Sequence, residues 1–456
     1  MNLIKLSFIF TVLMFFNFAS YADNHDKKKL VDEVKKITTK LESIDEEMPL
    51  NDPFAGQSSS ANTNTNLMLN EEESQDEMSL YNFKLVGLVT GKNFSYISLI
   101  KSDGYNHIEQ IYDKYYEFNE ELYKELTILR DDLKNSDDLK KNVIEIDKIE
   151  KKYTLFNGKI IQKFLDEVDC KPDLIGFHGQ TIFHNVKEKI SKQIGNGYLL
   201  SQLTKCSVVN KFRQLDLDNN GQGAPLTPIF HYLISQKIKE QFSIKYPIKF
   251  VNIGGITNVS LVLNNNEIKK DIFAYDVAPG NCLIDQWLRK NTNKRFDDNG
   301  SLAESGKVNE LVLNQIKDNF EIKSIKESLD INDFDINFVK GLNLEDGCAT
   351  LTEFTAYLIS EGLKKVDTIN NINTKNLIIC GGGRKNKTLL KKISQYLHND
   401  NLDIKNIDEF NISGDFVESQ AFGYLAVRSF LNLPISFPNT TRCLKPCSGG
   451  EIIKNF

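Results

Sequence analysis

The sequence lacks several features that define whole classes of protein. Its net charge of −6 gives it no basic excess, which argues against nucleic-acid binding, since such proteins usually carry a basic footprint. Seven cysteines are spread at irregular spacing, and no second pair joins Cys443 and Cys447 to complete a zinc motif. We therefore expect buried, reduced thiols, which suit a reducing compartment better than an oxidising one.

The chain is otherwise of ordinary globular composition. It has 456 residues, of which 40% are hydrophobic and 26% charged, so there is ample chain to bury a core. At ~150 residues per domain, this length predicts about three domains, or two large ones with an appendage.

The first hundred residues differ from the rest. Residues 1–22 predict a secretory signal or an uncleaved membrane anchor, because Lys5 precedes an apolar run over 6–18 that is shorter than the ~20 residues of a comfortable span. Residues 23–80, with six Lys against fourteen Asp and Glu, predict an amphipathic helix over 28–46 and then a disordered acidic linker. Residues 81–100 alternate like a β-hairpin around Gly91.

The body of the chain has the pattern of an α/β protein. A stretch over 108–168 has helical spacing, and after it short apolar strands alternate with helices, each strand ending in a glycine-rich turn. Ligands of α/β folds bind at the carboxyl ends of strands. The expected lobes are 81–248 and 249–456.

The first of these turns carry polar side chains suited to a ligand. His178, Gln180 and Thr181 follow the first strand, and His184 lies just beyond them. A second turn contains Arg213, Asp216 and a glycine-rich loop over 221–225, with Gln222 and Gly223, where the backbone can approach a ligand closely.

The later turns suggest phosphate binding. Gly254 and Gly255, with Asn258 beyond them, end a strand, and Gly381, Gly382 and Gly383 precede Asn386 and a helix. Backbone N–H groups at such turns can hold a phosphate. There is neither a Walker A motif nor a Rossmann fingerprint.

Three acidic residues in these turns have two interpretations each. Asp276 could contact a metal or hydroxyl group, or cap the next helix. Asp415 and Glu418 suit the dipole of a long helix, and Glu418 could alternatively face a cleft. Together the turns favour a two-lobed nucleotide phosphotransferase.

The set of motifs resembles one family. FHGQTIFH, FRQLD…GQGAPLTPIFH, VNIGGITN, DVAPGN, CGGGRKN and GDFVESQAFGYLAVRS resemble the anhydro-N-acetylmuramic acid kinases in order and spacing, over residues ~101–456. The resemblance implies the fold of the sugar kinase, actin and heat-shock ATPase superfamily, with two ribonuclease H-like lobes. It also implies ATP and Mg²⁺. In the implied reaction, water opens a 1,6-anhydro sugar and the freed 6-oxygen takes a phosphoryl group, yielding N-acetylmuramic acid 6-phosphate in peptidoglycan recycling.

The resemblance also assigns residues to the two ligands. It implies ATP contacts from Gly87, Gly91, Gly254, Gly255, Asn258, Gly381, Gly382, Gly383 and Asn386. It implies sugar-side or catalytic roles for His178, Gln180, Thr181, Lys211, Arg213, Asp216, Gln222, Gly223 and Asp276. The family further implies a homodimer and the cytoplasm, whereas residues 1–22 imply export or membrane association, so localisation stays open.

Two departures from the family pattern bear on activity. Residues 87–100 lack the Ser and Asp residues of the family's first phosphate loop, which suggests that a foreign, exported β-domain is joined near 97–101. Lys211 stands where the family's Asp-Phe-Arg has the Asp that activates water, and a protonated Lys cannot accept a proton. Impaired catalysis is therefore expected. The alternatives are a non-catalytic sugar-binding or envelope protein and, from residues 1–100 alone, a secretion or pilus accessory protein.

Overall fold

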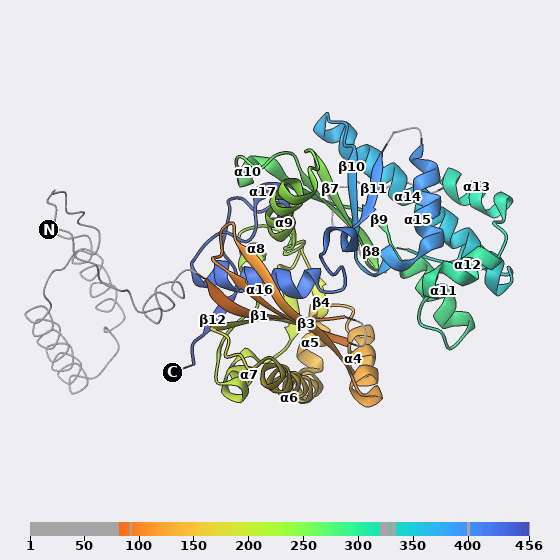
Figure 1. Cartoon of the computed structure of the whole chain (residues 1–456). Helices are drawn as coiled ribbons and strands as arrows, with labels where there is room; N and C mark the ends of the chain where they lie inside the picture. The colour runs from red at the N-terminus through yellow and green to blue at the C-terminus, as the bar shows by residue number, and fades with distance from the viewer. Residues whose placement is uncertain (1–81, 92–93, 320–328, 330–333, 399–401, 456) are drawn as a thin grey trace, which may run out of the picture. The chain divides into compact units, whose positions relative to one another are not determined.

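The computed structural model describes residues 82–91, 94–319, 329, 334–398 and 402–455 (Figure 1). The chain divides into two compact units, 1–69 and 70–456, and every described residue belongs to the second. The predicted signal at 1–22 and most of the predicted 23–80 segment fall in the first unit, and all of both lies outside the described residues.

A seven-stranded sheet forms the first lobe. Its order is β12-β6-β4-β1-β2-β3, with β5 paired to β4. β2 is antiparallel to both β1 and β3, whereas β1, β4 and β6 are parallel to one another. The strands are β1 (Phe83–Thr90), β2 (Phe94–Ser102), β3 (Ile108–Glu117), β4 (Leu174–Asn185), β5 (Ile190–Ile194), β6 (Ser207–Asn210) and β12 (Glu451–Ile453).

A five-stranded sheet forms the second lobe and repeats this order. Its strand order is β11-β10-β7-β8-β9. Counted from β9, two antiparallel pairings are followed by two parallel ones, as they are from β3 in the first sheet. The hairpin β7–β8 is therefore the topological counterpart of β1–β2. The strands are β7 (Ile248–Ile253), β8 (Ile256–Val262), β9 (Ile272–Pro279), β10 (Asn376–Cys380) and β11 (Asp403–Asn406).

Helices cover both sheets (Figure 1). Those of the first half are α4 (Glu120–Asp132), α5 (Ser136–Lys141), α6 (Val143–Val168), α7 (Gly197–Thr204), α8 (Gln214–Asp218) and α9 (Pro228–Phe242). Those of the second half are α10 (Ile268–Asp271), α11 (Cys282–Asn291), α12 (Ser301–Ser305), α13 (Glu310–Asn319), α14 (Leu344–Asn370), α15 (Lys387–Tyr396), α16 (Val417–Phe430) and α17 (Pro438–Thr441).

Local sequence signals explain several helix ends. Pro228 opens α9, because its fixed φ suits the first helical turn and its missing N–H is not needed there. Asn386 precedes α15, and its side chain accepts the N–H of Leu389 at 2.9 Å.

The helix predicted from residue 108 begins later than expected. Residues 108–117 form strand β3, paired along its length with β2. This part of the prediction is wrong because backbone pairing with β2 outweighs the helical spacing of the tyrosines. The helices begin at Glu120 instead.

The predicted hairpin over 81–100 is present, but it is not a separate domain. β1 pairs with β2 and also runs parallel to β4, with Leu85 opposite Leu174. The proposed junction at 97–101 would cut β2 inside the sheet. The expectation of a foreign β-domain here is therefore wrong.

The C-terminal part of the predicted second lobe returns to the first sheet. β12 pairs with β6, with Ile452 opposite Val209. α16 packs on β1, where the oxygen of Ser419 lies so near Gly87 that a Cβ there would be 1.7 Å from it. α16 and β12, which the prediction assigned to the second lobe, therefore pack on the first sheet, whereas α17 between them contacts β9 of the second sheet.

Three buried clusters make up the core. One fills the space between the two sheets through α9 and α16, and the others lie under the outer helices of each sheet. Of the seven cysteines, none is in a disulfide and all but Cys170 and Cys447 are buried, which confirms the prediction of buried thiols for five of them.

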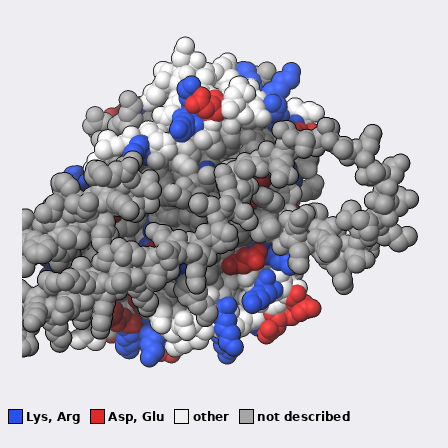
Figure 2. Space-filling model, turned by 90° about the vertical axis from the view of Figure 1, so that its left-hand side faces the viewer, with Lys and Arg blue, Asp and Glu red and all other residues white. Residues whose placement is uncertain are grey.

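Two surface observations concern partners. On the face in Figure 2, acidic and basic side chains lie beside one another and do not gather by sign. Among the helices of the described part, none combines the length and the apolar character that a membrane crossing requires.

Candidate functional site

A cleft lies where the hairpin corners of both sheets meet. It encloses about 730 Å³ of empty space, including the part open to solvent. Its lining comprises Val89, Gly91, Tyr96, Thr227, His231, Asn252, Gly254, Gly381, Gly382, Gly414, Asp415, Val417 and Glu418. The predicted glycine corners 254 and 381–382 therefore share one hollow.

The glycines of the second lobe leave room in this cleft. A Cβ at Gly382 would meet no atom within 4 Å, and one at Gly254 would come only within 3.4 Å of the oxygen of Ile256. Gly381 has a φ of +75°, which side-chain-bearing residues rarely adopt. The N–H of Gly254 donates to the carbonyl of Ile256 at 3.2 Å, so the space at these glycines, and not a free N–H at Gly254, is what lets an anion approach the backbone closely.

A buried arginine fixes the triple-glycine corner. Arg384 donates from Nη1 to the carbonyl of Gly381 at 3.1 Å and to Asp415 at 2.8 Å, and from Nε to Asp408 at 2.6 Å. Asp415 also binds Lys385 at 2.6 Å. Although burial alone would raise their pKa values, the hydrogen bonds from these cations hold the pKa of both carboxyls below the usual range.

Five of the residues expected to contact ATP do not line the cleft. Gly87 packs against α16, and a Cβ at Gly383 would lie 2.3 Å from Ile253. The carbonyl of Gly255 accepts the N–H of Gly280 at 2.8 Å, Asn386 caps α15, and Asn258 lies within β8. Only Gly91, Gly254, Gly381 and Gly382 of that set line the cleft.

Glu418 brings a carboxyl group into the cleft. It lies in the first turn of α16 and lines the hollow, so the cleft-facing interpretation is supported alongside the favourable helix dipole. Burial raises its pKa, and the charge of Arg213 acts in the opposite direction. A buried carboxyl near a cation can hold or release a proton in the cleft.

A second group of predicted residues surrounds Arg213. Its guanidinium donates from Nη2 to Nε2 of His178 at 2.9 Å and from Nη1 to the carbonyl of Gly223 at 2.8 Å. Nδ1 of His178 lies 2.8 Å from the carbonyl of Gly179, so Nδ1 carries the proton and Nε2 accepts. Burial, together with the charge of Arg213, lowers the pKa of His178 to about 3, which keeps the ring neutral.

Asp216 holds the glycine-rich loop in place. Its Oδ2 accepts the N–H of Gly223 at 2.7 Å, and its Oδ1 accepts the hydroxyl of Thr441 at 2.6 Å. The N–H of Gln222 binds the carbonyl of Thr441 at 2.7 Å. Asp216 is 1% exposed, and it lies outside the cleft lining.

Lys211 is not in the cleft. Its side chain is 64% exposed and pairs with Glu451 of β12 at 2.5 Å. Lys211 thus lies at the surface in this structure, and its catalytic role stays a prediction.

The other residues predicted to contact the sugar lie on different elements. Gln180 and Thr181 lie on β4, and the hydroxyl of Thr181 accepts from Gln193 at 3.3 Å. Asp276 lies inside β9 and accepts the N–H of Leu329 at 3.0 Å. It caps no helix, since Asn281 is the cap residue of α11. Burial raises its pKa to about 6.

Sequence reasoning missed seven residues of the lining, four of which have polar side chains. These four reach the cleft from β2, from α9 with its cap residue, and from β7. They are Tyr96, Thr227, His231 and Asn252. Asn252 precedes the recognised glycine pair and could have been found from that position. His231 stacks on Phe250 with ring centroids 4.9 Å apart, inside a helix whose orientation only packing sets.

Comparisons with known proteins agree with this architecture. The sequence model of the family "Anhydro-N-acetylmuramic acid kinase" matches residues 84–455. The protein of that name from Pelagibacter ubique is 48% identical over 332 residues, or 72% of this chain and 86% of that one. The one from Brucella canis is 36% identical over 310 residues, covering 67% and 80%.

Solved structures are more distant. A ROK family glucokinase from Streptomyces griseus in complex with glucose and AMPPNP covers 76% of this chain and 99% of its own, at 9% identity and a TM-score of 0.35. This likeness is too low to support an argument about the site.

Proposed function

This chain belongs to the anhydro-N-acetylmuramic acid kinase family, and on that premise we propose that it is an active ATP-dependent kinase of 1,6-anhydro-N-acetylmuramic acid. Water opens the anhydro ring at the anomeric carbon, and the freed 6-oxygen accepts the γ-phosphoryl group. The product is N-acetylmuramic acid 6-phosphate. The observation that carries the proposal is the single cleft shared by two glycine corners and the carboxyl of Glu418.

The second-lobe corners fit the phosphates of ATP. The space left at Gly254 and Gly382, and the positive φ of Gly381, let the backbone approach an anion closely. The Arg384 network keeps that corner in shape before any ligand arrives. When bound, ATP supplies the phosphoryl group.

A divalent cation also has suitable donors. Mg²⁺ is bound through one or two carboxylates together with substrate phosphates. Asp415 is an acidic side chain of the cleft lining, so it is the residue that would hold the cation. Its chemistry would be to offset the negative charge of the phosphates.

Glu418 is our candidate for the proton acceptor at the attacking water. It is an acidic side chain at the cleft with no assigned ion pair to Lys or Arg in the described part of the chain. Burial raises its pKa, which makes the carboxylate a stronger base, while Arg213 favours its ionised form. Neutral His178 holds Arg213 in position but cannot itself supply a proton near neutral pH.

We further propose that the sugar lies toward Arg213 and the 221–223 loop. The Arg213–His178 pair and the Asp216–Gly223 bond hold this side rigidly. Gln180, Thr181, Gln222 and Asp276 remain sugar-side candidates by resemblance alone.

The direct test is turnover of the purified full chain. With the anhydro sugar, ATP and Mg²⁺, mass spectrometry should detect the 6-phosphate, and omission of ATP should abolish it. Lys211→Asp, which restores the family residue, should leave the rate within about twofold, because residue 211 faces solvent. A large gain from Lys211→Asp would show that position 211 acts in the reaction.

One observation favours a non-catalytic sugar-binding protein as the second candidate. At the first corner, Val89 and Tyr96 line the cleft, in the stretch that lacks the acidic residues of the family's first phosphate loop. Calorimetry that detects the anhydro sugar but no ATP, together with an absence of product, would favour this alternative.

The homodimer and the signal or anchor at residues 1–22 are also proposals. Light scattering of the purified chain tests the first. N-terminal sequencing of the protein from its own cells tests the second, since cleavage after Ala22 would indicate export.

A further inference from the structure

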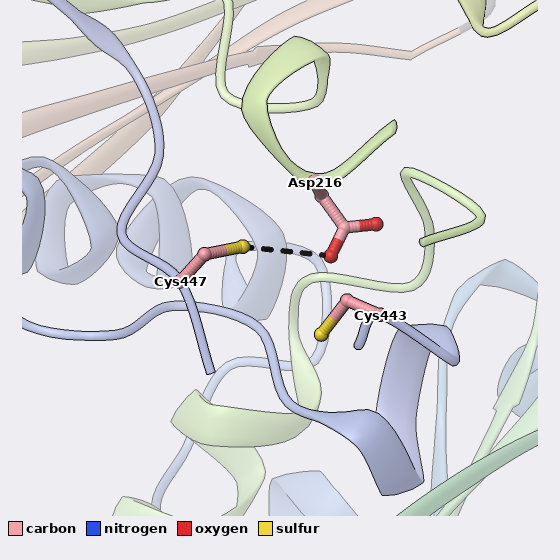
Figure 3. Close-up of side chains that lie close together, drawn as sticks. All are labelled: Asp216, Cys443 and Cys447. Carbon is pink, nitrogen blue, oxygen red and sulfur yellow. Dashed lines mark hydrogen bonds between the residues drawn. The ribbon is translucent and has the colours of Figure 1, made fainter. Parts of the chain in front are cut away.

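Two cysteines and an aspartate from opposite parts of the chain meet in one cluster (Figure 3). One ligand atom from each of Asp216, Cys443 and Cys447 can be chosen so that all three lie within 4.8 Å of one another. Asp216 comes from α8, whereas the cysteines come from the segment after α17. The sequence shows only the Cys443–Cys447 spacing, which by itself makes no metal motif.

The spacing of these atoms suits a thiophilic cation. Zinc binds sulfur at ≈ 2.3 Å and carboxylate oxygen at ≈ 2.0–2.2 Å in a tetrahedral arrangement, which places neighbouring ligand atoms roughly 3.5–3.8 Å apart. Sγ of Cys447 lies 3.9 Å from Oδ1 of Asp216. Small movements of flexible thiols would therefore complete the arrangement.

The surrounding hydrogen bonds orient two of the ligands. Asp216 receives the Thr441 hydroxyl at 2.6 Å on Oδ1 and the Gly223 N–H at 2.7 Å on Oδ2. A carboxylate offers about four acceptor positions, so both oxygens keep capacity for a cation. Oγ of Ser436 lies 3.0 Å from Sγ of Cys447. Such outer contacts are typical of protein metal sites.

The cluster is buried but can be reached from outside. Asp216 and Cys443 are buried, whereas Cys447 is partly exposed. Cys447 also lines a surface hollow with Leu215 and Asn219. An ion can therefore enter from that side, and a water molecule there can take the fourth position, as in sites with three protein ligands.

We propose that Asp216, Cys443 and Cys447 form a binding site for a zinc-class divalent cation that fastens the C-terminal segment to the 221–223 loop. This role goes beyond the kinase reaction and does not depend on it. Binding replaces the proton of each cysteine thiol with the cation, and the two protons pass to solvent. Affinity consequently rises with pH.

The experiment uses the full chain, reduced and freed of metal, with Co²⁺ as the probe. Stoichiometric binding should produce the thiolate charge-transfer and ligand-field absorption of tetrahedral cobalt, and Zn²⁺ should displace it. Cys443→Ser and Cys447→Ser should abolish the bands, while Cys170→Ser, a matched change at a remote partly exposed cysteine, should keep them. Thr441→Val should weaken Co²⁺ binding by about 10–100-fold, since it removes a bond that orients Asp216.

Three results would overturn the site. One is reduced protein that stays colourless in excess Co²⁺ and gains no thermal stability from Zn²⁺. Another is a Cys443–Cys447 disulfide that forms on mild oxidation in a chain that takes up no cation, which would assign the pair to redox chemistry. A band that survives in both serine variants would place cobalt elsewhere and also contradict the proposal.

Discussion

The two sheets place the same hairpin at the cleft but give it different surroundings. β1–β2 and β7–β8 occupy equivalent positions in sheets of the same strand order. The β7–β8 corner presents Asn252 and Gly254, whereas the β1–β2 side presents Val89, Gly91 and Tyr96. A shared topology thus fixes where a corner lies, while the side chains decide whether it can hold phosphate.

The hairpins also differ in how they are anchored. β1 is pressed against α16, which carries Glu418 into the cleft. Gly254, which directly follows β7, has no such close neighbour, because a Cβ there would make an ordinary contact of 3.4 Å. We infer that the first hairpin mainly positions α16 and that the second mainly receives the phosphates.

The largest expected effect is on Glu418. Glu418→Gln keeps the shape of the side chain but removes the proton acceptor, so kcat should fall by about 10²–10⁴-fold. Calorimetry should show that ATP affinity is retained, because the second corner is untouched. Glu361→Gln on the surface of α14 is the matched control. Turnover that is equal in the two variants would remove Glu418 from the chemistry.

Glycine substitutions in the two hairpins test their anchoring. Gly87→Ala would place a Cβ 1.7 Å from the Ser419 oxygen, so we expect a loss of about 3 kcal/mol in the free energy of unfolding. Gly254→Ala should cost less than about 1 kcal/mol. Urea denaturation followed by circular dichroism measures both. Equal losses would mean that the α16 contact gives β1 no special role.

A pH series compares the third strands of the two sheets. Burial raises the pKa of Asp113 on β3 and of Asp276 on β9 to about 6 from an ordinary value of 3.8. Because each folded-state pKa is the higher one, each carboxyl favours folding below pH ~4, and this contribution is lost as the pH rises through about 6. A difference of about two units corresponds to about 2–3 kcal/mol for each group.

Asn variants measure these two contributions separately. Asp113→Asn and Asp276→Asn should each flatten the fall in unfolding free energy between pH 4 and 7, measured by urea titration. Asp103→Asn, at an exposed aspartate that accepts two backbone N–H groups, is the control. If the pH dependence of the unfolding free energy is unchanged in either buried variant, that carboxyl does not cause the fall in stability.

The smallest expected effect concerns Lys211. Lys211→Ala removes an exposed pair with Glu451, which is worth at most about 1 kcal/mol, and the turnover should stay within about twofold. Kinetics with the anhydro sugar and ATP measure this. A tenfold change in kcat would place residue 211 back in the reaction.

The resemblance on short motifs predicted the family and the α/β class, and both are confirmed by the comparisons and the sheets. The strand-end pattern predicted Gly254 and Gly382, and both line the cleft, where a close approach of backbone to ligand would need glycine. The same pattern also predicted Gly87 and Gly383. These glycines allow close packing instead, Gly87 against α16 and Gly383 against β7. Motif spacing alone cannot separate these two uses of glycine.

The alternation of strands and helices and the positions of the glycine corners follow from the sequence alone, since these depend on local backbone preference and side-chain periodicity. The set of side chains that face the cleft depends on the folded chain as a whole. The fold turned Lys211 outward, brought Glu418 inward and set Asp216 beside Cys443 and Cys447. Those outcomes depend on contacts between residues far apart in the chain, which pairing and packing establish and local sequence does not specify.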